Sequence, residues 1–235
     1  MEPLSDYEFV KIWDSLRQDD KFYNTCFIVS IILKQGEFSQ YHNYSFEALD
    51  RVLFQNRIKT FGSIFHNYSK CPKCKEELEW SFDFENLNLP DFNSPKTEEF
   101  SFVYKHSNIK FRLPSFNDII LHDVTKIAEN CIISINDNED EKSKVSKELV
   151  QAVQKEMESV APFSNISFNL NCSACNHSWI DYFSISAYFI DEINLFAKKV
   201  MFQVHSICTK YNWSEKEVLI MSEKRRNFYL GLINS

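Results

Sequence analysis

Two Cys-x-x-Cys pairs constrain the fold of this 235-residue chain more than any other feature of its sequence. The first pair is Cys71 and Cys74, the second is Cys172 and Cys175, and 97 residues (75–171) stand between them. One such pair places two thiolates on a tight turn, whereas a structural zinc takes four soft ligands in a tetrahedron. Only together do the two pairs supply that set, so a shared site requires the two distant segments to meet.

The surroundings of the two pairs resemble each other. Each pair is followed by polar residues, a tryptophan, and then an aspartate among aromatic residues, in Trp80–Phe84 and in Trp179–Phe183. Glycine commonly follows the second cysteine of such a knuckle; here Lys75 and Asn176 stand there, and Asn adopts positive φ more readily than Lys. We predict two knuckles sharing one structural zinc, with free thiols or a disulfide between the knuckles as the alternative. The predicted ligands are Cys71, Cys74, Cys172 and Cys175.

Such a site would have an architectural role. Hydrolytic zinc needs a coordination position for water, and four thiolates leave none. His177 follows Cys175 closely and could replace a ligand or donate to a sulfur, but we expect it in the loop outside the ligand set. The chain has no His-x-Glu and no Gly-x-Ser-x-Gly motif, so we predict no enzyme and no small-molecule substrate. Redox chemistry at the cysteine pairs is the remaining enzymatic alternative.

Composition narrows the function classes further. The chain has 3 glycines and neither phosphate-loop motif, which argues against nucleotide-driven chemistry. Its net charge of -7 makes a general nucleic-acid binder improbable. The most apolar run, 26–33, is too short to span a bilayer, and the first residues do not resemble a signal peptide, so we expect a cytoplasmic protein without a membrane partner. The remaining cysteines, Cys26, Cys131 and Cys208, lie in apolar surroundings and should pack as small hydrophobic residues.

Hydrophobic periodicity predicts an α+β fold, with a Cys₄ zinc-ribbon and β-hairpin core flanked by N-terminal and C-terminal helices. We expect one compact domain of five consecutive parts. These are a helical segment (1–68), the first knuckle with a β-hairpin (69–115), a helical insertion with an acidic loop (116–163), the second knuckle (164–183) and the C-terminal helices (184–235).

Cap residues and periodicity place the individual elements. Helices should begin at Ser5 or Asp6, after the break at 18–21, and at Ser45, with Arg51 and Arg57 on the outer face of the third helix. The later expectations are a strand at 78–84, a hairpin at 100–113, helices at 116–134 and 147–160, and a strand at 166–170.

The C-terminal helices carry a basic cluster. A long amphipathic helix is expected at 184–210, followed by a capping box of Ser214 and Glu217 and a last helix at 223–233 capped by Ser222. The two short helices superficially suggest a helix-turn-helix. Because the basic cluster has three members in an acidic chain, we expect a docking surface for a protein instead of DNA. The cluster comprises Lys224, Arg225 and Arg226.

Several features of the chain carry a resemblance to a known family: an N-terminal helix with Trp13 and the stretches CPKC…LEWSFDF, FRLPSFNDI, CSAC…WIDYF, IDEINLFAKKVMFQVH and YNWSEKEVLIMSEKRRNFYLGLI. Together they resemble a zinc-ribbon family encoded with phage-tail-like contractile injection systems, similar to the baseplate hub assembly proteins, or chaperones, of T-even-like phages. The chain departs from the family after each knuckle and in the polar insert around Asp137. The functional residues it carries over are the four knuckle cysteines.

The resemblance implies a non-enzymatic protein that helps to build the baseplate or hub of a contractile tail, with baseplate, hub or spike proteins as partners. The alternative from a different class is a zinc-ribbon module that binds nucleic acid or acts with transcription, and such a module would show salt-sensitive binding. In the first reading, zinc joins two distant segments and thereby sets the geometry of both helical flanks.

Overall fold

The computed structural model describes residues 2–34, 38–87, 89, 99–121, 126–138 and 145–233. The chain divides into two compact units, which we describe separately: a terminal unit, Met1–Gln35 with Ser186–Ser235, and a central unit, Gly36–Ile185. Helices and short antiparallel strands occur together, which confirms the α+β prediction.

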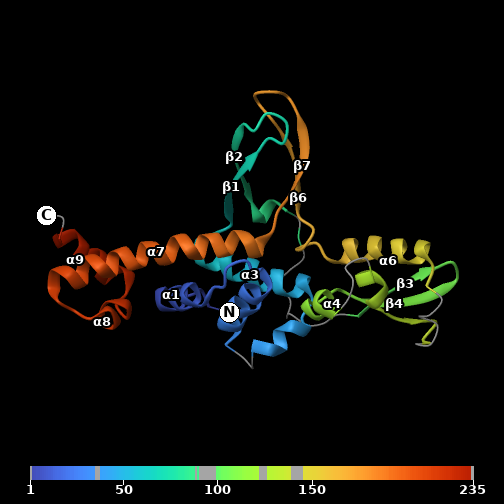
Figure 1. The fold of residues 1–235 in the computed structure, drawn as a ribbon, viewed down its shortest axis with the longest axis horizontal. Coiled ribbons are helices and arrows are strands. Elements are labelled where there is room, and N and C mark those ends of the chain that lie inside the picture. The colour runs from blue at the N-terminus through green and yellow to red at the C-terminus, as the bar shows by residue number, and fades with distance from the viewer. Residues whose placement is uncertain are drawn as a thin grey trace. The chain divides into compact units, whose positions relative to one another are not determined.

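The terminal unit is helical, and its helices begin where the cap residues predict. It contains α1 (Asp6–Ser15), α2 (Lys21–Leu33), α7 (Ile185–Tyr211), α8 (Glu215–Leu219) and α9 (Glu223–Ile233). Ser5 and Ser214 each form a complete capping box, with Glu8 and Glu217 respectively. The helix α9 turns back beside α7 (Figure 1), and Gln203 of α7 contacts Asn227 of α9. A core joins α1, α7 and α8 through Val10, Val200, Val204, Ile207, Val218 and Leu219.

One member of the predicted basic cluster is part of this core region. Arg226 is only 1% exposed; it forms an ion pair with Asp6 and donates to the carbonyl oxygen of Met221 at 2.6 Å. The expectation of a surface cluster of three is therefore wrong for Arg226, because a buried guanidinium requires an anionic partner. Lys224 and Arg225 are exposed, as expected.

The central unit has its own hydrophobic core around a three-stranded sheet. The strands β3 (Glu99–Tyr104), β4 (Ser107–Arg112) and β5 (Ile132–Ile135) pair in the order β3-β4-β5, and α6 (Lys147–Val160) lies along them (Figure 1). Phe111 and Val153 are almost fully buried in this core. The predicted hairpin is confirmed, with its turn at Lys105 and His106, and so is the helix that follows Ser146.

The long helix predicted at 116–134 is wrong. In the structure α4 covers Phe116–Leu121 and α5 covers Ile127–Asn130, and the apolar run after Cys131 forms β5. Two apolar residues of this run face the core from the strand, and the sheet is completed by it. The residues of the predicted acidic loop beyond Asn138 lie outside the described part of the chain.

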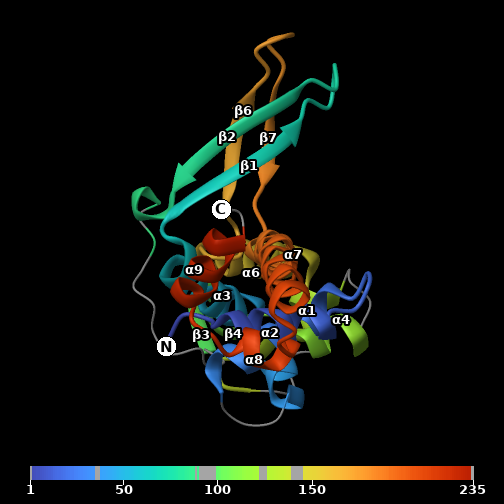
Figure 2. The ribbon, with the colours of Figure 1, turned by 90° about the vertical axis from the view of Figure 1, so that its left-hand side faces the viewer.

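Two further hairpins carry the cysteine pairs. The 3₁₀ helix η1 (Phe38–Asn43) and the helix α3 (Phe46–Phe61) come before the first hairpin, which is made of β1 (Ile64–Lys70) and β2 (Glu77–Asp83). A 3₁₀ turn, η2 (Phe84–Asn86), follows it, and the second hairpin consists of β6 (Ser167–Asn171) and β7 (Ser178–Tyr182). The two hairpins lie side by side with their knuckles at the same end (Figure 1 and Figure 2). The prediction that residues 1–68 are helical is wrong from Ile64 onward, where β1 begins.

The end of the hairpins opposite the knuckles packs on an aromatic cluster. Phe54 of α3 is fully buried, and its ring centroid lies 5.0 Å from that of Phe84 and 5.9 Å from that of Phe183. Phe65 of β1 and Phe163 also contact it. One helix thereby holds both hairpins, although 83 residues (84–166) separate them in the sequence.

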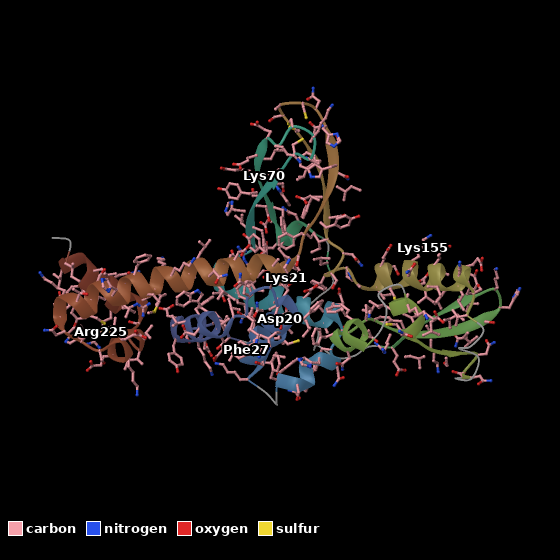
Figure 3. All side chains as sticks on the ribbon, in the orientation of Figure 1. Asp20, Lys21, Phe27, Lys70, Lys155 and Arg225 are labelled. Carbon is pink, nitrogen blue, oxygen red and sulfur yellow. The ribbon has the colours of Figure 1, made fainter. Side chains whose placement is uncertain are left out.

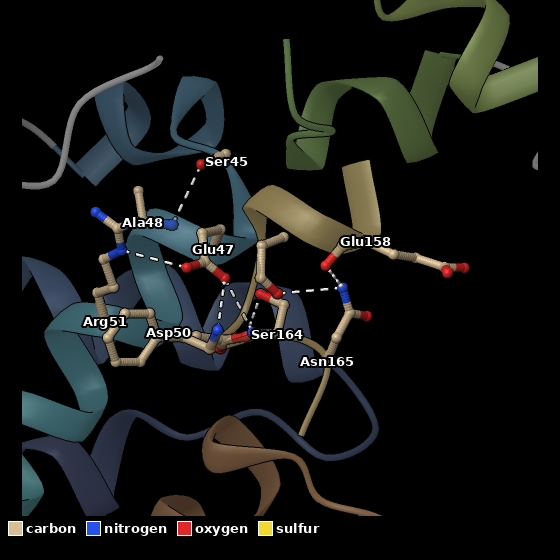
Figure 4. Close-up of polar contacts among 10 residues, drawn as sticks. Ser45, Glu47, Ala48, Asp50, Arg51, Glu158, Ser164 and Asn165 are labelled. Atoms are coloured by element: carbon tan, nitrogen blue, oxygen red, sulfur yellow. Dashed lines mark hydrogen bonds and ion pairs between the residues drawn. The ribbon is translucent and has the colours of Figure 1, made fainter. Parts of the chain in front are cut away.

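Polar contacts from α3 fix the chain just before β6. Ser45 caps the helix, and Oε2 of Glu47 accepts hydrogen bonds from the backbone N–H groups of Phe163 (3.0 Å) and Ser164 (2.9 Å), as Figure 4 shows for Ser164. Oδ2 of Asp50 accepts from the Ser164 hydroxyl at 2.8 Å. Arg57, expected outside, is buried and donates to the carbonyl oxygens of Gly62 and Ile64, which fixes the start of β1.

Candidate metal centre

The four knuckle cysteines lie together in the central unit. Their four Sγ atoms all lie within 4.8 Å of one another; the residues are Cys71, Cys74, Cys172 and Cys175. Across the two hairpins, the Sγ atoms of Cys71 and Cys175 are 3.7 Å apart, and those of Cys74 and Cys172 are 3.5 Å apart. Four potential ligands from two distant segments therefore meet at one point.

Each pair is presented by a hairpin turn with the same backbone hydrogen bonds. The N–H of Cys71 donates to the carbonyl oxygen of Glu76, and that of Cys172 donates to His177, both at 2.9 Å. The residues after the second cysteines, Lys75 and Asn176, donate back to the carbonyl oxygens of Cys71 and Cys172. Such a turn requires a left-handed residue, and Lys75 (φ 66°) and Asn176 (φ 54°) adopt that conformation without glycine.

The spacing of the sulfurs suits a tetrahedral metal. With metal–sulfur bonds of about 2.3 Å, the edge of an MS₄ tetrahedron is about 3.8 Å. The two sulfur–sulfur separations across the hairpins, 3.5 and 3.7 Å, are close to this edge. Each of the four is a free thiol, and the separations are far longer than a disulfide bond. The residues present therefore fit a soft, thiolate-bound metal ion.

Electrostatics at the site favour partial ionisation of the thiols. Burial raises the pKa of the Cys71 thiol, but hydrogen bonds from the backbone N–H groups of Cys74 and Lys73 and from neighbouring thiols outweigh burial and lower the pKa to about 6. A hydrogen bond from the backbone of Glu76 lowers the pKa of the Cys74 thiol. The surrounding thiols and burial have the opposite and larger effect, so the pKa is raised to about 12. Four sulfurs this close cannot all carry negative charge unless a cation neutralises them.

The two hairpins also hold each other directly. Oγ of Ser69 in β1 donates to a carboxylate oxygen of Asp181 in β7, and Nε1 of Trp80 donates to the same Ser69 oxygen at 2.8 Å. Phe168 of β6 packs against both aromatic residues of β2, with ring centroids 4.7 Å from Trp80 and 4.7 Å from Phe82. We call this contact of Trp80, Phe82 and Phe168 between the two hairpins the aromatic seam. The cysteine cluster joins the same two hairpins at their knuckle end.

The structure places the other candidate residues apart from the cluster. His177 is half-buried and its ring stacks near that of Trp179, with centroids 6.2 Å apart, and the sulfur group does not include it. Cys26 and Cys131 are buried, and burial raises the pKa of each thiol to about 12. Cys208 is half-buried beside the core of the terminal unit.

Sequence reasoning missed part of the seam. Ser69 and Asp181 gave no signal, because a single serine and a single aspartate in different strands carry no pattern. The apparent match between Trp80 and Trp179 also differs in the structure: Trp80 stands six residues after its cysteine pair and Trp179 four. Only Trp80 donates to Ser69 across the first hairpin, so the two tryptophans are not equivalent.

Comparison with known proteins assigns the family. The family model described as T4 bacteriophage base plate protein matches residues 28–190, a range that contains both knuckles and the aromatic seam. The comparisons with curated proteins and with solved structures each found no match. None of the helices in the described ranges is long and apolar enough to cross a membrane. Since the match covers more than half of the sequence, the chain belongs to the family of T4 bacteriophage base plate proteins.

Proposed function

We propose that this chain is a structural or assembly protein, acting in the manner of a chaperone, at the hub of a contractile-tail baseplate. The observation that carries the proposal is the family match over residues 28–190. The resemblance of the knuckles and C-terminal helices to hub assembly proteins supports the more specific assignment to the hub. Its partners would be hub or spike proteins of the same particle.

In this proposal Cys71, Cys74, Cys172 and Cys175 bind one structural zinc. Support comes from the donor set, four thiols, and from sulfur separations close to a tetrahedral edge. Zinc would supply the positive charge that lets the sulfurs ionise together, and no position for substrate or water would remain. The role that follows is to fix the β1–β2 hairpin against the β6–β7 hairpin, in a protein that is not an enzyme.

The surface of the hairpins does not favour the nucleic-acid alternative. Around the first knuckle, Lys70 forms an ion pair with Glu77 at 2.9 Å, which removes one cation from the available surface. The strands β6 and β7 contain no Lys or Arg. The first knuckle keeps two exposed lysines, Lys73 and Lys75, but they stand beside the exposed Glu76 and Glu79, whereas binding to a nucleic-acid backbone requires a larger cluster of cations.

The proposal is tested in cells that make the contractile particles. Removal of the gene should leave the other baseplate proteins synthesised but unassembled, and the wild-type chain should restore baseplates. A pull-down with the tagged chain should recover hub or spike proteins. Normal baseplates without the chain, or recovery of polymerase or nucleic acid alone, would contradict the proposal.

A further inference from the structure

The charge of the chain is unevenly distributed. Residues 193–235 contain seven Lys or Arg and three Glu, a net charge of +4, so the remaining residues carry -11 of the total of -7. Within α7 the stretch from Asn194 to its end contains no acidic residue, and in α9 none follows Glu223. The helical end of an acidic protein is therefore basic.

The exposed side chains of these helices form what we call the basic face. On α7 the exposed side chains recur at helical spacing and include both apolar and cationic groups. The exposed side chains of α9 also include both kinds. The basic face comprises Leu195, Lys198, Lys199, Phe202, His205 and Lys210 of α7 with Lys224, Arg225 and Phe228 of α9. Figure 3 labels Arg225, which belongs to α9.

Large apolar groups stand among these cations. Phe202 is 73% exposed and Phe228 is 64% exposed, so two large aromatic side chains are left mostly in contact with solvent. Gln203 donates to Asn227 at 3.5 Å where the two helices pack, so each phenylalanine stands one residue from that contact. Leu195, two turns before Phe202 on the same helix, is 70% exposed. Exposed anchors surrounded by charge are typical of a binding surface.

Two acidic residues at the start of the chain are engaged by cations outside the basic face. Asp6 is engaged by the buried Arg226, and Glu8 forms an ion pair with Lys34 at 3.1 Å. Lys198 and Lys224 form no ion pair with any residue in the described ranges. Lys198 and Lys224 therefore remain available to a partner, while Lys199 and Arg225 lie over the rings of Phe196 and Tyr229.

We propose that the basic face binds an acidic amphipathic helix of another protein. Leu195, Lys198, Phe202 and His205 are spaced as i, i+3, i+7 and i+10, which matches the spacing of anchors along a partner helix. From Leu195 to Lys210 the face extends about 22 Å, enough for about four turns of such a helix. A short acidic segment neutralises the local charge, whereas the -11 elsewhere on the chain repels a long polyanion such as DNA.

The inference deepens the proposed function, because it gives the chemistry by which a baseplate partner would be recognised. The test replaces Phe202 or Phe228 singly with the photo-crosslinking residue p-benzoylphenylalanine, which keeps an aromatic group at the position. The full chain is made in cells that produce the particles and is irradiated during assembly. Tyr182, 78% exposed on the second hairpin, receives the same residue as a control site.

Cross-linked peptides of another protein, acidic in net charge and containing apolar residues, are expected from positions 202 and 228 but not from 182. The double variant Lys198→Glu/Lys199→Glu should lower the cross-link yield about tenfold, since two attractive charge contacts become repulsive. The matched control Lys147→Glu/Lys155→Glu changes net charge equally on exposed positions of α6 and should leave the yield unchanged. Figure 3 labels Lys155 on that helix.

Cross-links to nucleic acid, to a second copy of this chain, or to an uncharged or basic segment would overturn the inference, and so would the absence of any cross-link at 202 and 228. Its failure is distinguishable from failure of the proposed function. If the partner is acidic but is not a baseplate protein, the basic face stands and the hub assignment falls. If baseplates need the chain but its cross-links are not to an acidic segment, the hub assignment stands and the inference about the basic face falls.

Discussion

Replacement of Cys172 by serine is the sharpest perturbation of the proposed metal centre. Cys172 is fully buried, and its sulfur lies 3.5 Å from that of Cys74 in the other hairpin. A serine hydroxyl is a harder and poorer zinc ligand than a thiolate, so the variant should lose its metal. The hairpins are then held together by their aromatic seam, by the Ser69–Asp181 hydrogen bond and by their shared packing against Phe54 of α3.

The expected magnitude follows from the separation of the two pairs. Zinc closes a loop of 97 residues (75–171), and cross-linking a loop of about 100 residues removes about 5 kcal/mol of conformational entropy from the unfolded chain. Whole domains are stable by only about 5–15 kcal/mol. For a unit of this size a loss of about 5 kcal/mol lowers the melting temperature by about 10–20 °C.

The assay measures zinc content by elemental analysis and thermal unfolding by tryptophan fluorescence. A Trp13→Phe/Trp213→Phe background leaves Trp80 and Trp179, both on the hairpins, as the reporters. Cys208→Ser is the matched control, because Cys208 lies outside the sulfur group. It should retain one zinc per chain and nearly the wild-type melting temperature. A Cys172→Ser variant that keeps its zinc and melts with the wild type would refute the reasoning.

Three further predictions concern single positions. Lys75→Gly relieves a left-handed non-glycine residue and should raise the melting temperature by about 2–4 °C; a decrease would show that the turn does not strain Lys75. Asp6→Asn leaves the buried Arg226 without its anion and should cost about 3 kcal/mol in urea unfolding, and a cost below about 1 kcal/mol would contradict the pairing. Burial raises the pKa of Asp50 to about 7, against about 4 in an unfolded chain, so the folded state keeps a proton in this window and its stability falls as the pH rises from 4 to 7. Asp50→Asn should remove that part of the pH dependence, and a urea midpoint difference between variant and wild type that is constant from pH 4 to 7 would count against it.

The sequence predicted the features that depend on local chemistry. Ser5, Ser45 and Ser214 cap helices as expected, because a cap is a contact between residues three apart. The two Cys-x-x-Cys turns were also readable, and their sulfurs meet in the structure. For the helix caps and the cysteine turns, the types of residue and their spacing were enough to predict the local structure.

Features that depend on tertiary contacts were not readable. Burial alternates along β1, but of its inward positions Phe65, Asn67 and Ser69 only the first is apolar, so the sequence lacks the hydrophobic alternation that predicts a strand. The apolar run of β5 fits a helix as well as a strand until its pairing with β4 is known. Arg226 finds its anion 220 residues away in the sequence, and no local pattern announces such a pair.

The most direct test of the central claim is zinc K-edge X-ray absorption on the purified chain. The account predicts one zinc per chain with four sulfur neighbours at about 2.3 Å and no nitrogen or oxygen in the first shell. Absence of zinc, or a first shell in which nitrogen or oxygen replaces sulfur, would contradict the assignment of Cys71, Cys74, Cys172 and Cys175 as its ligands.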